Sequence, residues 1–166
     1  MSIMIFSRIL TQRSLAWMLF ALCTVSAFSR AENAVPHPGT VVLTSRHSFD
    51  TLQKRLVDAV AVHKMGLVAQ ASASSGAAAR GVKIPGNVVL MVFRNDYAVR
   101  MLKASVPAGI EAPLRFYVTE NTDATASVTY RKPSAVFAPY GSAALDALAA
   151  ELDPIFAQIA QDAVGK

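Results

Sequence analysis

The chain has a single cysteine, Cys23, among its 166 residues, and only 16% of its residues are charged. Because Cys23 lies in an apolar N-terminal stretch, the rest of the chain has no thiol for a disulfide, a cysteine nucleophile, an iron–sulfur cluster or a c-type haem. A Gly-x-Ser-x-Gly elbow and a glycine-rich phosphate loop are also missing. These absences exclude the chemistries with the most specific sequence motifs, and no cofactor is predicted.

The N-terminal stretch has the pattern of a secretory signal. Arg8 and Arg13 precede an apolar run at residues 15–28, and small residues follow it up to Ala31. We therefore predict cleavage after Ala31 and a periplasmic or secreted protein, without stable membrane insertion after cleavage. The alternative is a retained anchor, but a run of about 14 residues gives roughly 21 Å of helix, short of a ~30 Å hydrocarbon core.

Cleavage changes the electrostatic character of the chain. It removes three arginines and no acidic residue, so the formal net charge falls from +5 to +2 over the remaining 135 residues. This weak charge gives little general attraction to nucleic acid, which we exclude as a partner. Residues 32–39 combine two prolines with polar residues and predict a flexible leader, followed by a single domain at residues 40–166.

The first part of this domain predicts a strand followed by a helix. Residues 40–46 form a β-branched run that favours a strand. The next segment, 47–66, has apolar residues at helical spacing, with Ser48 able to cap its start and Gly66 able to end it.

The next segment predicts two further strands. Residues 67–73 favour a strand, and the small residues after it favour one helical turn capped by Ser75 and broken by Gly81. Residues 88–93 are continuously apolar, which predicts a central strand buried on both sides or placed at a dimer contact.

A short helix at 96–105, capped by Asp96, and a loop at 106–113 are predicted next. The last helix has a kink or restart predicted at Pro154, because Asp153 is a favourable cap. Its expected core positions are Leu145, Leu148, Leu152, Ile155, Ile159 and Ala163.

Residues 111–133 predict a hairpin. Its expected core side chains are Leu114, Phe116 and Val118 on one strand and Ala126, Val128 and Tyr130 on the other, with Val118 opposite Val128. This register leaves a loop at 122–124, in which one residue needs a positive φ, a role that Asp or Asn can fill.

The opposite face of the hairpin is polar, cationic and partly aromatic. We single out Arg115, Tyr117 and Arg131 as candidate ligand-binding residues, since two guanidinium groups on adjacent strands, in slightly offset register, can hold a carboxylate or phosphate. The alternative is the ordinary solvated face of an antiparallel sheet.

Metal binding and general-base catalysis would need the histidines. His37, His47 and His63 do not share ligand spacing, so no metal site and no catalytic residue is predicted; His47 with Asp50 is the only local pair worth testing. No carboxylate pair stands out for a glycosidase-type reaction.

Two further binding modes remain open. The alanine-rich last helix leaves room for a small apolar ligand beside the sheet, or its alanines mark close packing. The strand at 88–93 offers a homodimer contact through an apolar patch or edge.

The order strand, helix, strand, strand, short helix, strand, strand, helix defines an α+β fold with an antiparallel sheet of about five strands and two long helices on one face. The segments "SRHSFDTLQKRL", "VVLMVFRND", "APLRFYVTEN" and "VTYRKP" resemble family 302 of the domains of unknown function. The resemblance implies a TATA-binding-protein-like sandwich without an established activity. Members often carry Asp-His ahead of the glycine matching Gly81, where this chain reads "SASSG" at residues 72–76, and Asn-Asp before the proline matching Pro133, where it has Arg131-Lys132.

The complete domain pattern, combined with the lack of a specific catalytic constellation, favours a non-enzymatic binding or interaction module. Its expected partner is a small ligand or an envelope protein. The alternative is an envelope hydrolase whose active site is assembled only by folding.

Overall fold

Five strands with alternating buried and more exposed side chains form one sheet with a buried face. The structure is a computed structural model that describes residues 37–165. All neighbours are antiparallel, in the order β1-β5-β4-β3-β2. The strands are β1 Thr40–Thr44, β2 Gly66–Ala71, β3 Asn87–Phe93, β4 Leu114–Glu120 and β5 Ala126–Arg131. The predicted signal segment and most of the predicted leader lie outside the described residues.

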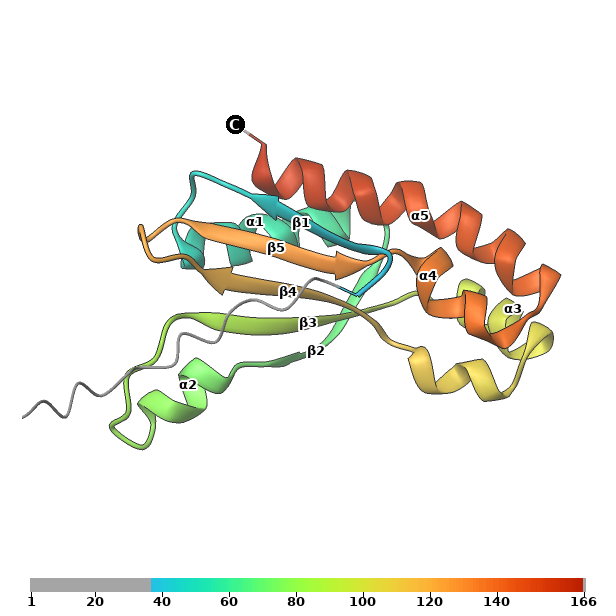
Figure 1. The fold of residues 1–166 in the computed structure, drawn as a ribbon, viewed down its shortest axis with the longest axis horizontal. Helices are drawn as coiled ribbons and strands as arrows, with labels where there is room; N and C mark the ends of the chain where they lie inside the picture. The colour runs from blue at the N-terminus through green and yellow to red at the C-terminus, as the bar shows by residue number, and fades with distance from the viewer. Residues whose placement is uncertain (1–36, 166) are drawn as a thin grey trace, which may run out of the picture. The chain divides into compact units, whose positions relative to one another are not determined.

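Two long helices cover this face, as predicted. Helix α1, Phe49–Val62, contacts β3, β4 and β5, while α5, Ala143–Val164, contacts β1 and β5 and packs along α1 (Figure 1). Their apolar faces bury side chains such as Leu56 and Leu148, which belong to the same core cluster as Phe116 of β4. The hydrophobic effect on this shared core holds the layers together, and the predicted α+β architecture is confirmed.

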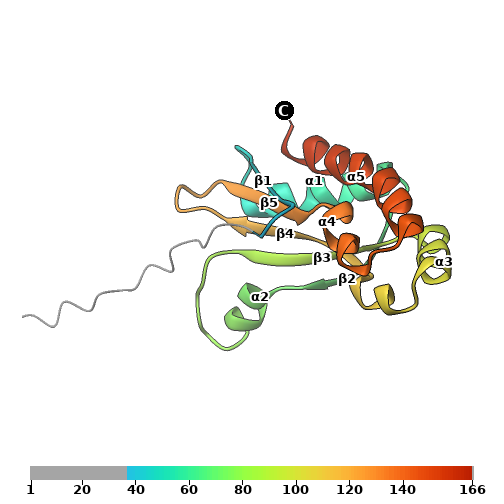
Figure 2. The same ribbon diagram turned by 45° about the vertical axis from the view of Figure 1, so that its right-hand side comes forward.

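Short helices connect these elements. They are α2 Ala73–Ala78, α3 Asn95–Ala104, α4 Pro133–Phe137 and the 3₁₀ turns η1 Pro107–Glu111 and η2 Ala138–Tyr140. In Figures 1 and 2, α2 lies beyond β2 and β3, on the other side of these strands from α5. The segment predicted as a loop at 106–113 contains η1, and the sequence did not predict α4 or η2.

The predicted hairpin register is confirmed, because Val118 pairs with Val128. The residue with positive φ in its turn is Ala124, at +64°, so the expectation of Asp or Asn in that role was wrong. Asp123 instead accepts hydrogen bonds from the backbone N–H and the hydroxyl of Thr125, at 3.1 and 2.6 Å. These bonds fix the turn by an Asx-type contact and let alanine take the strained conformation.

Helix α1 begins as predicted and ends earlier than predicted. Ser48 accepts a hydrogen bond from the Thr51 N–H at 3.4 Å. The helix stops at Val62 because Lys64 adopts φ +57° and Met65 donates its N–H to the Val60 carbonyl, as in a Schellman motif. Gly66, predicted to end the helix, belongs to β2 instead.

Two predicted helix caps were wrong. The α2 cap is Ser72, whose hydroxyl accepts the Ser75 N–H at 3.0 Å, so Ser75 is the donor rather than the cap. In α3, the N-cap position is Arg94, and Asp96 in the first turn accepts two hydrogen bonds from its guanidinium.

Within the chain, strand β3 is buried on one face only, which contradicts the first of the two predicted alternatives, burial on both sides. Val88, Leu90 and Val92 are at most 2% exposed, whereas Val89 and Met91 on the other face are half-buried. Because β3 pairs with β2 and with β4, it has no free edge for a dimer.

Helix α5 continues through Pro154 without a restart. Since Pro154 is exposed, its ring is accommodated on the solvent side of the helix. Phe156 is fully buried and stacks on Phe116 with ring centroids 4.8 Å apart, while Ile155, predicted for the core, is half-buried.

Candidate functional site

The sheet has a second face, which we call the open face because α1 and α5 lie against the first. Strand alternation directs onto it the residues that separate the core positions. They are exposed or half-buried and include Val42, Val89, Met91, Arg115, Tyr117, Thr129 and Arg131. All three candidate residues from the hairpin are therefore on this face.

The two arginines lie side by side on adjacent strands. Phe116 pairs with Tyr130, so the same antiparallel register places Arg115 directly opposite Arg131, not offset as predicted. Thr40 pairs with Arg131 and Met91 pairs with Arg115, which extends this row across four strands. Like charges opposite each other destabilise a sheet, so an anion between the two guanidiniums would relieve repulsion.

A hollow of about 150 Å³ has both arginines among its lining residues, and we call it the arginine hollow. It is lined by Glu111, Leu114, Arg115, Arg131 and Val136. Arg131 donates to the Ala135 carbonyl at 3.1 Å, which ties its guanidinium to α4. Within residues 37–165, neither arginine forms an ion pair with a carboxylate.

Glu111 is the acidic group of the arginine hollow. Its carboxylate accepts a hydrogen bond from the Tyr140 hydroxyl at 3.0 Å. Burial, with this hydrogen bond, raises the pKa of Tyr140 above its usual value, so the phenol stays a donor at neutral pH. The arginine hollow thus combines the cationic Arg115 and Arg131 with the carboxylate of Glu111, which already accepts a hydrogen bond from Tyr140.

Tyr117 lies two residues after Arg115 on β4, so it occupies the next row of the open face. It pairs with Val89 and Thr129, is 40% exposed, and lines a second hollow of about 530 Å³. This tyrosine hollow is bounded by Ala71, Ser72, Ala73, Asn87, Val89 and Tyr117. The three predicted residues therefore share one face but belong to two neighbouring hollows.

The histidines are used in structural contacts. Nε2 of His47 forms a hydrogen bond with the Gly165 carbonyl at 2.9 Å. Nε2 of His63 lies 2.7 Å from a carboxylate oxygen of Asp162. Arg55 also donates to three carbonyls at the end of α5, including that of Gly165 at 2.9 Å. Cationic donors at a helix C-terminus stabilise its dipole. In the described part of the chain, no three His, Cys, Asp or Glu residues gather as metal ligands.

The predicted space beside the last helix is narrow. A mainly apolar cavity of about 30 Å³ lies between β3, α3 and α5, with Val92, Met101 and Leu152 among its lining residues. Ala149 and Ala160 of α5 are fully buried, as in close helix packing. A volume this small accommodates about two water molecules, so we do not assign this cavity a ligand.

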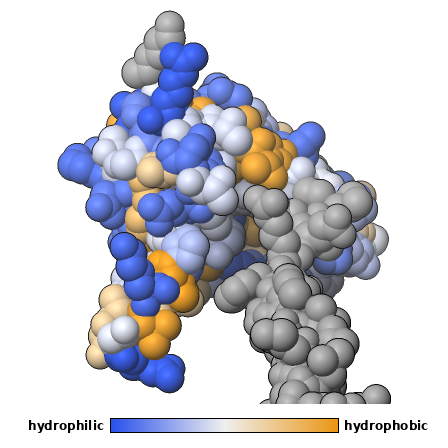
Figure 3. Space-filling view, turned by 60° about the vertical axis from the view of Figure 1, so that its left-hand side comes forward, coloured by the Kyte–Doolittle hydropathy of each residue, from blue (hydrophilic) through white to orange (hydrophobic). Residues whose placement is uncertain are grey.

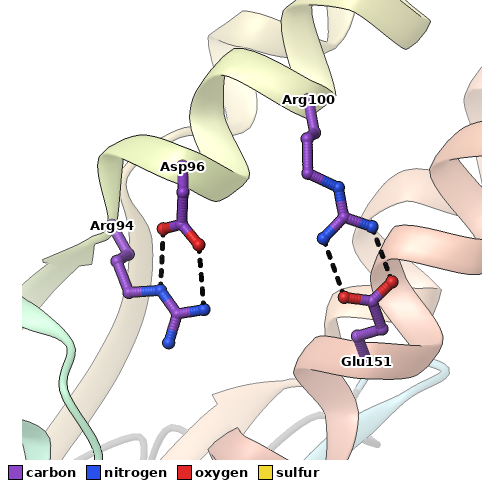
Figure 4. Close-up of polar contacts among 4 residues, drawn as sticks. All are labelled: Arg94, Asp96, Arg100 and Glu151. Atoms are coloured by element: carbon purple, nitrogen blue, oxygen red, sulfur yellow. Dashed lines mark hydrogen bonds and ion pairs between the residues drawn. The ribbon is translucent and has the colours of Figure 1, made fainter.

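Charged side chains hold α3 at the edge of this cavity. Arg94 pairs with Asp96, and Arg100 makes two hydrogen bonds to Glu151 of α5, at 2.8 and 2.6 Å (Figure 4). The Arg94 guanidinium also lies 4.1 Å from the centre of the Tyr97 ring. These contacts satisfy Arg94 at the N-cap of α3 and Arg100 within it, in contrast to Arg115 on the open face.

The architecture defines a class of small α+β domain in which two helices cover one face of an antiparallel sheet. The family model of the domain of unknown function DUF302 matches residues 41–162. The chain therefore belongs to the DUF302 family, as the sequence segments predicted.

A solved structure has the same architecture. The crystal structure of an uncharacterized conserved DUF302 protein from Bacillus stearothermophilus aligns with a TM-score of 0.69 and 18% identity, covering 76% of this chain and 98% of that chain. At this identity the likeness concerns the fold alone. Comparison with curated proteins finds no match. Within residues 37–165, no helix is both long and apolar enough to span a membrane.

Proposed function

We propose that this DUF302 domain is an exported binding module that holds a small anionic ligand at Arg115 and Arg131. One observation carries the proposal: the sheet register sets two arginines opposite each other beside a hollow, and neither pairs with a carboxylate in the described residues. Paired guanidiniums match the planar geometry of a carboxylate and the oxygens of a phosphate.

Support also comes from the surroundings of the arginine pair. Arg131 is oriented by its bond to the Ala135 carbonyl, so less side-chain entropy is lost when a ligand binds. Thr40, which pairs with Arg131, brings a hydroxyl to the same row. An anion with two or three oxygens can use both guanidiniums and this hydroxyl together.

The test is a titration of the exported protein with acetate and with inorganic phosphate, followed by amide chemical shifts. We expect the shifts to centre on residues 114–116 and 130–132. Replacing Arg115 with alanine should weaken binding by about ten- to a hundredfold, because a charge-assisted hydrogen bond contributes about 1.5–3 kcal/mol. The matched control is Arg80→Ala, which removes one exposed charge outside the open face.

Unfolding in urea separates binding from folding. We expect Arg115→Ala to keep or slightly raise the midpoint of the parent protein, because its side chain is exposed and its removal relieves the repulsion from Arg131. A midpoint shift as large as that of a core substitution would make the arginine structural. Equal anion affinities in Arg115→Ala and Arg80→Ala would overturn the proposed site.

Export is the second part of the proposal, and it is supported by the pattern of Arg8, Arg13 and the apolar run at 15–28. Native mass spectrometry of the protein recovered from an envelope fraction tests it. We expect the mass of residues 32–166, with or without a bound anion, and the same spectrum gives the oligomeric state. The mass of the full chain would contradict cleavage and return the apolar run to the role of an anchor.

A further inference from the structure

Apolar side chains continue the arginine row across the open face. Met91 pairs with Arg115, and Tyr117, two residues along β4, pairs with Val89. Both partners on β3 are half-buried, while Tyr117 is 40% exposed. Successive residues of one face are about 7 Å apart along a strand, so this apolar surface starts within one row of the guanidiniums.

The apolar surface ends at a fixed boundary. The tyrosine hollow is closed on one side by Ala71 and by the start of α2. Asn87 holds this start in place, since its side-chain oxygen accepts the Ala73 N–H at 3.0 Å and its own N–H donates to the Ser74 hydroxyl at 3.0 Å. The boundary is therefore built by hydrogen bonds rather than by a free loop.

On the other side of Tyr117, toward β5 and β1, the same row has a different composition. Beyond Tyr117 the row continues through Thr129 to Val42 on the edge strand β1, where Val42 is 50% exposed. Hydrophobic patches among hydrophilic residues are also visible on the face drawn in Figure 3. Toward β3 and β4, the arginine hollow, the apolar side chains of Met91 and Val89, and the tyrosine hollow follow one another.

We propose that the ligand is an amphipathic anion, whose acid group lies at Arg115 and Arg131 and whose apolar body extends over Met91 and Tyr117 into the tyrosine hollow. This inference rests on the proposed function, because the acid group uses the same arginines. Charge complementarity selects the head of the ligand, and burial of apolar area against Val89 and Tyr117 selects its body.

The experiment measures dissociation constants of the exported protein for acetate, butyrate, hexanoate and octanoate. We expect the affinity to rise about two- to fourfold for each methylene that lies against Met91, Val89 or Tyr117. The upper value, fourfold, corresponds to about 0.8 kcal/mol for a fully buried methylene. Arg115→Ala should weaken all four ligands by a similar factor, because all share the acid group.

Two identical substitutions on one row give the matched comparison. Val89→Thr places a hydroxyl on the proposed path, while Val42→Thr makes the same change on the far side of Thr129. We expect Val89→Thr and Tyr117→Thr to flatten the dependence of affinity on chain length, and Val42→Thr to keep the parent's dependence.

The outcomes separate the two claims. An affinity that stays flat from acetate to octanoate, yet falls in Arg115→Ala, overturns the amphipathic ligand and leaves the anion site in place. A rise with chain length that is independent of Arg115 overturns the anion site and this inference with it. A rise that Val42→Thr abolishes and Val89→Thr does not would put the apolar body on the wrong side and overturn the inference.

Discussion

Asp153 of α5 accepts two hydrogen bonds from Ser134 of α4, one from the backbone N–H at 2.9 Å and one from the hydroxyl at 2.6 Å. The bonded N–H is one of those that α4 leaves without an intrahelical partner in its first turn. A carboxylate from another helix therefore caps α4. Because α4 contributes Val136 to the arginine hollow, this contact also positions one boundary of the candidate site.

Replacing Asp153 with alanine should lower the free energy of unfolding by about 1–3 kcal/mol, since a part-buried donor loses its acceptor. Urea denaturation measures the change. Ser134→Ala should cost a smaller amount, and the double variant should cost less than the two single changes together, because both remove the same contact. Additive losses would show that the two residues act separately.

The core position of Phe156 gives a second prediction. Phe156→Ala should destabilise the protein by about 3–5 kcal/mol, as expected for a buried aromatic ring that leaves a cavity. The neighbouring change, Ile155→Ala, is the matched control and should cost about 1–2 kcal/mol, because Ile155 is only half-buried. Similar losses for the two variants would contradict the orientation of α5 after Pro154.

The ion pair between α3 and α5 predicts a change in acid titration. Hydrogen bonds from Arg100 hold the pKa of Glu151 below its usual value. A lowered folded-state pKa stabilises the protein above the unfolded-state pKa, and this stabilisation is lost as the pH falls through the folded-state pKa. In Arg100→Ala, the pKa of Glu151 should rise toward its ordinary value in a carboxyl NMR titration.

Asp96 supplies the internal control for that titration. Its pKa is lowered chiefly by the hydrogen bond from Arg94, so it should stay low in Arg100→Ala. If the Glu151 titration is the same in the parent and the variant, the two-bond contact in Figure 4 does not persist in solution.

Glu111 gives a prediction of opposite sign to the arginine substitutions. Its negative charge lies in the arginine hollow, so Glu111→Gln should strengthen acetate binding. Removing a like charge roughly 6 Å away in water-like surroundings is worth about 0.7 kcal/mol, or about threefold in affinity. Weaker acetate binding in this variant would show that Glu111 supports the site through its contact with the Tyr140 hydroxyl more than it repels the anion.

The placement of Arg115, Tyr117 and Arg131 on one face followed from the sequence. A strand has a period of two, so the pattern of Leu114, Phe116 and Val118 determines both faces at once. The arginine hollow did not follow from it. Glu111 and Val136 come from η1 and α4, which are five residues each and too short to carry a helical period.

Within the described residues, the sequence by itself determined the elements whose patterns are long: the hairpin register, the amphipathic α1 and the α+β class with its family. Tertiary structure alone decided that Thr40 lies beside Arg131, that Asp153 caps α4 rather than restarting α5, and that Phe156 replaces Ile155 in the core. The physical reason is that periodicity records which side of an element is buried. Which distant element supplies the neighbour is set by packing between helices and strand edges, which a local pattern does not encode.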